Sequence, residues 1–380
     1  MTRLLQPLHV PTGAEIASVL PELEAALADD GPAFLPLPRG DDQEIRRLTD
    51  ALAPGEPIGD DISLVVATSG TTGVPKGALL TASALRASGN ATHTRLGGPG
   101  SWLLALPAHH IAGLQVLLRS VLASTDPTIV DVAEGFEPAA LTSAIASMSG
   151  PRKYTSLVPT QLIKALDDPD ATAALASLDA VLLGGAATPA PVLQRAAAAG
   201  IEVVRTYGMS ETCGGCVYDG VPLDGAEIRI EGERVLLGGA MIADGYRGLP
   251  DHPAFAEPGW FRTDDAGTVT DGVLRIHGRL DEAISTGGLT VVPQVVEAVL
   301  SEHPYIRECA VIGVPDTRLG QRVVAVIVSG SATPTVEELR EHIARTLPVT
   351  ASPREVHVVD SLPLRGPGKI DRRALVTRFS

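Results

Sequence analysis

Short apolar runs alternate with helical stretches through the first half of the chain. Residues 62–67, 102–106 and 180–183 are such runs, and each is followed by a turn of Gly, Pro, Ser or Thr. Stretches typical of helices come later, at residues 114–122 and 190–199. Short apolar runs predict buried strands, and strands that alternate with helices predict an α/β sheet. Ligands bind to such sheets beyond the carboxyl ends of the strands, which is where the unusual loops of this chain fall.

Residues 1–60 precede the first of these strand and loop units. Their pattern predicts an amphipathic helix at residues 14–28, a strand at residues 33–37 and a second helix near residues 43–52. Proline and glycine residues then interrupt the chain before the first apolar run. We identify no catalytic or binding chemistry in this segment.

The pattern changes in the second half of the chain. Short apolar runs separated by glycines come first, and they predict the antiparallel strands of a small sheet or barrel. Further on, residues 309–312 and 322–328 predict two strands. Residues 336–347 predict a helix, which a capping box of Thr335 and Glu338 would open.

The expected fold class is α/β. It comprises a large N-terminal domain of α/β sheets with a small β subdomain, residues 1–280, and a mobile α+β C-terminal domain, residues 281–380. The length of 380 residues agrees with two domains. A hydrophobic content of 44% is enough to bury a core in each.

Composition also limits the partners. The formal net charge of −15 argues against a nucleic-acid partner, because phosphate backbones are bound by clustered Lys and Arg. No apolar run reaches the ~18 residues of a membrane span, and polar residues interrupt the N-terminus where a signal peptide would have its apolar core. We therefore expect a cytoplasmic protein.

Cys213 and Cys216 lack a second pair of ligands nearby, which favours structural thiols over a zinc or redox site. A homodimer is possible, since dimers are the commonest soluble assemblies.

Residues 68–77 read Thr-Ser-Gly-Thr-Thr-Gly-Val-Pro-Lys-Gly and follow the first apolar run directly. The glycines expose backbone N–H groups, and the hydroxyls and the lysine ammonium are donors to phosphate oxygens, so the loop is typical of a polyphosphate cradle. It differs from the Walker pattern, in which Gly-Lys-Ser/Thr closes the loop. A flexible surface turn is the alternative, but it would not need so many hydroxyls beside a lysine. The expected phosphate-binding residues are Thr68, Ser69, Gly70, Thr71, Thr72, Gly73 and Lys76.

This run resembles the phosphate-binding signature of the adenylate-forming superfamily, which includes acyl-CoA synthetases, luciferases and the adenylation domains of peptide synthetases. The resemblance covers most of the chain from Ile62 onward. It implies that a small-molecule carboxylic acid attacks the α-phosphate of ATP, that pyrophosphate leaves, and that the acyl-adenylate then reacts with CoA. The implied cofactors are ATP, CoA and Mg²⁺. Such an enzyme needs an adenine pocket, a ribose anchor, a magnesium ligand and a cation at the developing charge.

Residues 207–212, Tyr-Gly-Met-Ser-Glu-Thr, follow a predicted strand and resemble the Tyr-Gly-x-Thr/Ser-Glu signature of the superfamily. The resemblance implies that Tyr207 lies beside the adenine and that Glu211 binds Mg²⁺, for which a carboxylate is a suitable hard ligand. On composition alone, ordinary loop residues are an equal alternative. The implied nucleotide contacts in this region are Gly184, Gly185, Ala186, Tyr207, Gly208, Met209, Ser210 and Thr212.

Residues 259–265 resemble the Gly-Trp-x-x-Thr-Gly-Asp motif of the superfamily, whose last Asp accepts the ribose hydroxyls. That residue is Asp265 here, while Asp264 takes the usual place of glycine and leaves open which acid makes the contact. The later Gly-Arg-Leu-Asp sequence resembles the hinge motif, which implies that Arg279 lies near the ribose and that Asp281 is the pivot. A solvated ion pair is the alternative for these two residues.

Residues 362–372 resemble the last motif of the superfamily, whose lysine, Lys369 here, enters the site during adenylation. A cation there would stabilise the charge that passes through the α-phosphate, whereas a solvated basic tail is the alternative. Residues 285–288 contain Gly287 and Gly288, which would let the pantetheine arm of CoA pass close to the backbone. Each motif alone is weak evidence, but their joint occurrence in the order of the superfamily favours a resemblance to the adenylate-forming enzymes over coincidence.

Residues 106–113 match the motif that flanks the acyl pocket, so His110 either contacts the acid or is a buried structural histidine. The short N-terminal part and several runs resemble the compact actinobacterial o-succinylbenzoate–CoA ligases of menaquinone biosynthesis, which implies that acid as substrate. Another small aryl or acyl acid–CoA ligase, or a free-standing adenylation enzyme that loads a carrier protein, is the alternative. A catalytically silent relative that binds nucleotide for regulation is a third, although Glu211 and Lys369 are both present.

Overall fold

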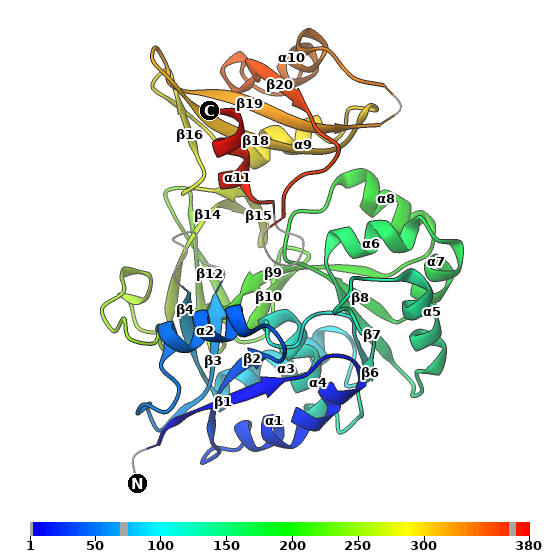
Figure 1. Ribbon diagram of the computed structural model, residues 1–380, viewed down its shortest axis with the longest axis vertical. Coiled ribbons are helices and arrows are strands. Elements are labelled where there is room, and N and C mark those ends of the chain that lie inside the picture. Colours follow the sequence, from blue (N-terminus) through cyan, green and yellow to red (C-terminus); the bar gives the residue numbers. More distant parts are fainter. Residues whose placement is uncertain (1–2, 69–74, 331, 365–369) are drawn as a thin grey trace. The chain divides into compact units, whose positions relative to one another are not determined.

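A computed structural model describes residues 3–68, 75–330, 332–364 and 370–380. The chain separates into two compact units. The first comprises Met1–Gly185, Arg195–Arg229 and Leu236–Arg262, and the second comprises Ala186–Gln194, Ile230–Val235 and Thr263–Ser380. Helices and sheets occur in both, so the predicted α/β class is confirmed (Figure 1).

The first unit begins with a four-stranded sheet, drawn in shades of blue in Figure 1. Its strands are β1 (Leu5–Val10), β2 (Ala33–Pro38), β3 (Ile62–Thr68) and β4 (Lys76–Thr81), and the helices along this stretch are η1 (Gly13–Val19), α1 (Leu20–Ala26) and α2 (Asp42–Leu52). β1, β2 and β3 are parallel, and β4 returns antiparallel to β3. Leu35, Leu52 and Val65 belong to the core that this sheet shares with α2. The strand at residues 33–37 and the helix near residues 43–52 are confirmed, whereas the helix predicted at residues 14–28 is divided into the 3-10 helix η1 and the α-helix α1, and β1 was not predicted.

The phosphate motif connects β3 to β4. Thr68, the last residue of β3, is the cross-strand partner of Lys76, the first residue of β4. Directly opposed residues in an antiparallel pair lie about 5 Å apart, so the two ends of the connection are held together. Ser69, Gly70, Thr71, Thr72 and Gly73 of the motif lie outside the described residues.

A seven-stranded sheet has the order β11-β10-β9-β8-β7-β5-β6. Its strands are β5 (Ser101–Leu104), β6 (Thr128–Ile129), β7 (Lys153–Leu157), β8 (Ala180–Leu183), β9 (Val203–Met209), β10 (Gly214–Tyr218) and β11 (Val221–Pro222). The helices of this part are α3 (Ala82–Arg95), α4 (Ile111–Leu122), α5 (Pro138–Ser147), α6 (Pro159–Leu166), α7 (Pro169–Leu175), α8 (Ala190–Ala198) and η2 (Ser210–Thr212). The strands from β5 to β9 pair in parallel, as the alternation of strands and helices predicted.

The third sheet has the order β12-β13-β14-β15. Its strands are β12 (Ala226–Glu231), β13 (Arg234–Gly239), β14 (Trp260–Thr270) and β15 (Val273–Arg279), and η3 (Pro253–Phe255) lies between β13 and β14 in the chain. β14 and β15 form an antiparallel hairpin, which agrees with the glycine-separated runs of the sequence. Its register pairs Asp265 with Arg279, two of the residues expected near the ribose.

The second unit ends in a sheet with the order β17-β16-β19-β18, to which β20 adds beside β19. Its elements are β16 (Ile284–Thr286), β17 (Leu289–Val291), α9 (Pro293–Leu300), β18 (Ile306–Asp316), β19 (Gly320–Ser329), α10 (Val336–Ala344), η4 (Val349–Ala351), β20 (Glu355–Val358) and α11 (Arg372–Phe379). Glu338 N–H donates to Thr335 Oγ1, and Thr335 N–H donates to Glu338 Oε2, so the predicted capping box opens α10.

Alternate side chains of β18 and β19 point to opposite faces of the sheet, and each face has its own hydrophobic core. Val311 and Ala325 face one side and pack with residues of α9 and α10, whereas Ile312 and Val326 face the other side and pack with Leu375 of α11. Successive residues of a strand point to opposite faces, so a continuous apolar strand can serve two layers of helices at once.

Candidate active site

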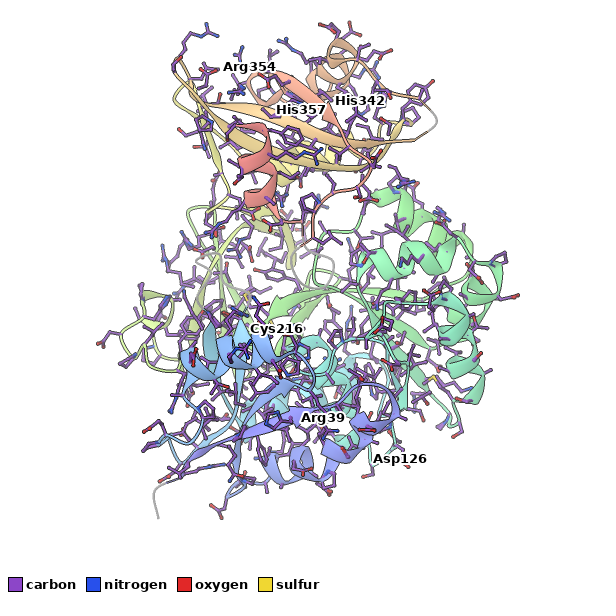
Figure 2. All side chains as sticks on the ribbon, viewed as in Figure 1. Arg39, Asp126, Cys216, His342, Arg354 and His357 are labelled. Carbon is purple, nitrogen blue, oxygen red and sulfur yellow. The ribbon has the colours of Figure 1, made fainter. Side chains whose placement is uncertain are left out.

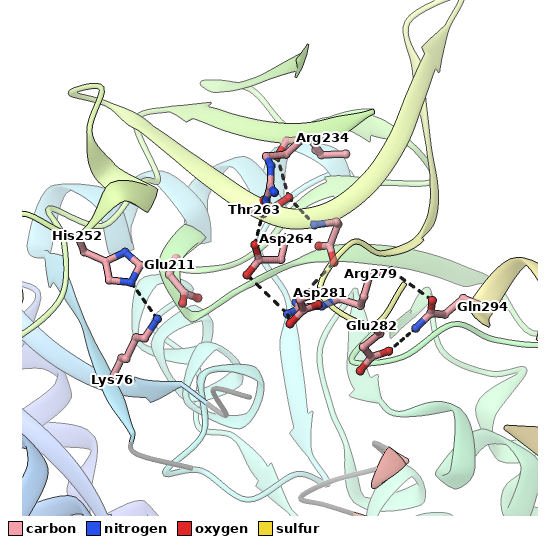
Figure 3. Close-up of polar contacts among 12 residues, drawn as sticks. Lys76, Glu211, Arg234, His252, Thr263, Asp264, Arg279, Asp281, Glu282 and Gln294 are labelled. Carbon is pink, nitrogen blue, oxygen red and sulfur yellow. Dashed lines mark hydrogen bonds and ion pairs between the residues drawn. The ribbon is translucent and has the colours of Figure 1, made fainter. Parts of the chain in front are cut away.

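Lys76, at the end of the phosphate motif, lies against an aromatic cluster. Its Nζ lies 2.9 Å from Nε2 of His252 and 5.1 Å from the centroid of the Tyr246 ring. Figure 3 shows the contact with His252. The Tyr246 ring meets the rings of His252 and Phe255 edge to face, with centroids 4.8 and 5.0 Å apart. No motif in the sequence marked Tyr246 or His252.

Glu211 lies in η2, directly after β9, and only 6% of it is exposed. The hydroxyl of Tyr246 donates to its Oε1 at 2.5 Å. The backbone carbonyl of Glu211 accepts a hydrogen bond of 2.9 Å from Ala243 N–H. A buried carboxylate requires such donors, because burial without hydrogen bonds disfavours its charged form.

The turn that carries Glu211 is held by its own side chains. Thr212 Oγ1 accepts from Met209 N–H at 2.9 Å and lies 2.6 Å from the carbonyl oxygen of Gly214, to which it donates. The hydroxyl of Ser210 donates to the carbonyl of Ala67 in β3 at 3.4 Å. This last contact ties the turn to the strand that leads into the phosphate motif. Tyr207 and Gly208 complete the predicted segment at the end of β9.

Two glycines of the predicted nucleotide segments have a steric reason to be glycine. A Cβ at Gly208 would overlap the carbonyl oxygen of Gly214 on the neighbouring strand. A Cβ at Gly184, which follows β8, would collide with the side chain of Thr206. Gly185 and Ala186 come next in the chain and are exposed.

His110 stands at the N-terminal end of α4. Its ring centroid lies 4.1 Å from that of His109. Burial and the neighbouring His110 lower the pKa of His109 to about 3, so His109 is neutral at physiological pH. The predicted segment therefore brings two imidazoles to the start of this helix.

Arg119, on the same helix, was not singled out in the sequence. It is 3% exposed, and its Nη2 lies 3.4 Å from the hydroxyl of Tyr218, while its guanidinium stacks 5.0 Å from the Trp102 ring. Burial lowers its pKa. Within the described part of the chain, no carboxylate forms an ion pair with Arg119. The sequence contained a sign of this, because Arg119 is the only charged residue in the otherwise uncharged stretch of residues 111–122.

In the second unit, the two neighbouring acids of β14 have different surroundings. Asp265 is 6% exposed, and its Oδ1 lies 3.6 Å from Nη1 of Arg279. Asp264 is more exposed, and its Oδ1 forms a 2.9 Å ion pair with Arg234. Arg234 also donates to the carbonyl of Thr263. Both acids thus lie near Arg279, since Asp264 Oδ2 is 3.9 Å from its Nη2, but only the exposed acid also pairs with Arg234.

Arg279 and Asp281 form a two-bond pair, in which Nε and Nη2 each lie 2.8 Å from one carboxylate oxygen of Asp281 (Figure 3). Burial opposes the charge of Arg279, but the hydrogen bonds to Asp281 and the charges of Asp265 and Asp264 raise its pKa above the ordinary value. The expected pivot residue therefore fixes the guanidinium beside Asp265.

Residues near Asp281 continue this polar network. Gln294 Oε1 accepts from Arg279 N–H at 3.2 Å, and its Nε2 donates to Glu282 Oε2 at 2.5 Å. Glu282 in turn lies 3.4 Å from Nε of Arg372. The network thus reaches α11, which begins after the last motif. Lys369 itself lies outside the described residues.

Gly287 and Gly288 form the two-residue turn between β16 and β17 and are exposed. Their φ angles are +59° and +80°. Two-residue hairpin turns with positive φ at both central positions strongly favour glycine. The turn alone therefore explains both glycines, and a contact with CoA is an additional expectation.

The cysteines are unpaired thiols. Cys213 and Cys216 are free and buried, and Figure 2 labels Cys216 on β10. Burial raises the pKa of Cys216 to about 12. Among the described residues, no group of His, Cys, Asp and Glu forms a metal cluster of three or more. The expectation of structural cysteines is consistent with both observations. None of the described helices has the length and apolar character that crossing a bilayer requires.

Comparison with known proteins gives matches along nearly the whole chain. Residues 11–244 match the family described as "AMP-binding enzyme", and residues 295–369 match the "AMP-binding enzyme C-terminal domain". A "Probable 2-succinylbenzoate--CoA ligase" of Mycobacterium tuberculosis is 58% identical over 382 residues, which cover 99% of each chain. A "2-succinylbenzoate--CoA ligase" of Salmonella typhimurium is 34% identical and covers 81% of this chain and 67% of its own.

A solved structure has the same architecture. It is the wild-type E. coli MenE "with bound m phenylether-linked analogue of OSB-AMS", which matches with a TM-score of 0.76 and 26% sequence identity. The match covers 100% of this chain and 89% of that one.

Proposed function

The chain belongs to the AMP-binding enzyme family, and from this membership we propose that it is an AMP-forming o-succinylbenzoate–CoA ligase. It converts o-succinylbenzoate, ATP and CoA to o-succinylbenzoyl-CoA, AMP and pyrophosphate, a step of menaquinone biosynthesis. The observation that carries the proposal is the 58% identity along 99% of both chains with a protein named for this activity.

In the first half-reaction, a carboxylate oxygen of the acid attacks the α-phosphorus of ATP. The bond from the α-phosphorus to the bridging oxygen breaks, and pyrophosphate leaves. Lys76 is suited to bind the departing phosphates, because it ends the phosphate motif and offers a point charge. By the resemblance of its motif, Lys369 supplies the cation at the α-phosphate.

In the second unit, Asp265 is the better candidate for the ribose hydroxyls. It is buried, whereas Asp264 is more exposed and forms a 2.9 Å ion pair with Arg234. A carboxylate accepts hydrogen bonds from both hydroxyls of a ribose. This assignment follows the resemblance of residues 259–265 to the motif whose last Asp accepts the ribose hydroxyls.

Glu211 fits the role of a magnesium ligand. Mg²⁺ is usually bound by one or two carboxylates together with phosphate oxygens and water, and it does not need a complete protein cage. A buried carboxylate whose Oε1 accepts a hydrogen bond from the Tyr246 hydroxyl matches that donor set. When bound, the ion would neutralise phosphate charge, and the protein's part is to hold the Glu211 oxygens in place.

Arg119 accounts for the second carboxylate of the proposed acid. o-Succinylbenzoate carries two carboxylates, of which one is activated and the other stays charged. Arg119 offers a buried cation about 13 Å along α4 from His110, where the acyl-pocket motif lies. A buried charge needs a partner of opposite sign, and the second carboxylate of the substrate would supply it.

In the second half-reaction, the CoA sulfur attacks the acyl carbonyl and AMP leaves. The turn at Gly287 and Gly288 is the proposed path of the pantetheine arm, and Asp281 is the proposed pivot between residues 1–280 and 281–380. We further propose a cytoplasmic location and a homodimer, for which light scattering of the purified protein is the test of assembly.

Pyrophosphate exchange across a panel of acids tests the function. We expect strong exchange with o-succinylbenzoate and weak exchange with benzoate and with 2-butyrylbenzoate, which lacks the second carboxylate. Strong exchange with benzoate or fatty acids, and none with o-succinylbenzoate, would point to another acid–CoA ligase. Replacing CoA by a carrier protein separates a ligase from a carrier-loading enzyme. No exchange with any acid, together with retained ATP binding, would identify a silent nucleotide-binding protein.

A further inference from the structure

One short segment, residues 243–255, contacts both charged side chains of the first unit's site. Its backbone is fixed on β4, the strand that follows the phosphate motif. Leu79 N–H donates to the carbonyl of Gly245 at 3.0 Å, and Arg247 N–H donates to the carbonyl of Gly77 at 2.8 Å. The residue between these two contacts is Tyr246, which forms a bridge with Ala78.

The Tyr246 side chain is therefore held at both ends. Its ring is packed between His252 and Phe255 and is 5% exposed. Its hydroxyl donates to Glu211 Oε1 at 2.5 Å. Hydrogen bonds from O–H groups to carboxylates in this distance range are charge-assisted and strong, so the phenol fixes the plane of the Glu211 carboxylate.

His252 is oriented in a similar way. Its ring meets the Tyr246 ring edge to face, with centroids 4.8 Å apart, and its Nδ1 lies 3.2 Å from the backbone nitrogen of Ala254. In the neutral tautomer that carries its proton on Nδ1, the opposite nitrogen, Nε2, accepts a hydrogen bond from the Lys76 ammonium, 2.9 Å away. Figure 3 shows Lys76 between His252 and Glu211.

We propose that Tyr246 and His252 are positioning residues for nucleotide binding: Tyr246 orients Glu211 toward the magnesium ion of the nucleotide, and His252 holds Lys76 toward its phosphates. The assignment rests on the proposed function, since it requires a nucleotide at this site. The roles of the two residues can be tested separately, because Tyr246 acts through the metal ligand Glu211 and His252 acts through Lys76.

Calorimetric titration of the full-length protein with ATP, once with Mg²⁺ and once with EDTA, tests the assignment. Tyr246→Phe removes only the hydroxyl, and we expect it to reduce the gain in ATP affinity from Mg²⁺ about tenfold while leaving affinity in EDTA unchanged. His252→Asn replaces the ring by a shorter polar side chain that cannot reach Lys76. We expect it to weaken ATP binding about tenfold under both conditions and to keep the gain from Mg²⁺.

Phe255→Leu is the matched control, because it disturbs the same aromatic cluster without touching a polar contact. We expect it to change neither quantity. An unchanged gain from Mg²⁺ in Tyr246→Phe, or equal losses in Tyr246→Phe and Phe255→Leu, would mean that Tyr246 only packs. Unchanged ATP binding in His252→Asn would remove the role of His252. Failure of the unaltered protein to bind ATP would instead overturn the proposed function.

Discussion

One guanidinium nitrogen of Arg372, Nη2, lies 2.6 Å from Oε1 and 2.7 Å from Oε2 of Glu297. Glu297 Oε1 also accepts from Val311 N–H at 2.6 Å, so the pair joins α11, α9 and β18. Burial raises the pKa of Glu297, and the charge of Arg372 acts against that increase. The start of α11 is thus anchored by a partly buried ion pair.

Arg372→Met should destabilise the second unit by about 1–3 kcal/mol, because it leaves a partly buried carboxylate without its cation. Urea unfolding measures the change. The exposed neighbour gives a control, since Arg373→Met should alter stability by no more than about 0.5 kcal/mol. Adding Glu297→Leu to Arg372→Met should recover much of the loss, as removal of both charges leaves no uncompensated one. Equal effects at Arg372 and Arg373 would contradict the anchoring role.

The Asp265→Asn and Asp264→Asn variants should differ in their preference for ATP over 2′-deoxy-ATP. We expect Asp265→Asn to lose the preference for ATP over 2′-deoxy-ATP, because the buried acid is the proposed acceptor. Asp264→Asn should retain that preference, since its carboxylate is bound to Arg234. Pyrophosphate exchange with both nucleotides measures the ratio. The reverse result would assign the ribose to Asp264.

Arg119→Met should raise the KM for o-succinylbenzoate about tenfold to a hundredfold, because a charge-assisted contact to the second carboxylate is lost. It should leave the KM for ATP unchanged. Folding stability should not fall much, since a buried cation without a carboxylate contributes little to it. Arg195→Met, at an arginine paired with Asp167 on the surface, is the control. An equal loss for 2-butyrylbenzoate would show that Arg119 does not recognise the second carboxylate.

Lys76→Met should lower the rate of pyrophosphate exchange about 10²–10³-fold, as expected for the loss of a cation at a reacting phosphate. The exposed Lys164 on α6 is the matched control, and Lys164→Met should exchange like the unaltered enzyme. If both variants retain full exchange, the lysine of the motif does not act on the phosphates.

His93 makes stability depend on pH. Its pKa is lowered from 6.5 to about 4 by burial, and the charge of Arg119 adds to this. Its Nε2 accepts a hydrogen bond from Trp102 Nε1 at 3.2 Å, which requires the neutral ring. Unfolding therefore takes up a proton in this range. The neutral His93 ring therefore contributes fully to the free energy of unfolding above pH 6.5. This contribution decreases by up to about 3 kcal/mol as the pH falls toward 4.

His93→Gln should flatten the decline of unfolding free energy between pH 6.5 and 4. Chemical unfolding at four pH values across that window measures it. His9→Gln, at an exposed histidine of β1, should leave the decline as it is in the unaltered protein. A decline of the same steepness in His93→Gln would show that other groups cause it.

Local pattern was sufficient for much of the fold. The run at residues 62–67 covers all but the last residue of β3, the helix predicted at residues 190–199 matches α8, and the capping box opens α10 as expected. These features depend on neighbours in the chain. The end of α10 was less well predicted, because the helix stops at Ala344 and the pattern continued to residue 347.

Pairings between distant segments had no local signal. β1 is interrupted by Pro7, and only its partner β2 makes it a strand. Arg119 meets Tyr218, and Lys76 meets His252, across separations of 99 and 176 residues. The two acids of β14 were indistinguishable in the sequence, although adjacent strand residues face opposite sides and only one of them is buried.

The cross-strand pair of Thr68 and Lys76 has a consequence for the integrity of the chain. The antiparallel ladder from Ile62 to Thr68 and from Lys76 to Thr81 is formed on both sides of the connection and does not depend on its continuity. A protease that cut the backbone between the two strands would therefore yield two fragments that stay associated. Because the cut falls within the phosphate motif, the associated fragments would keep the paired strands but lose the continuous loop that the proposed activity requires.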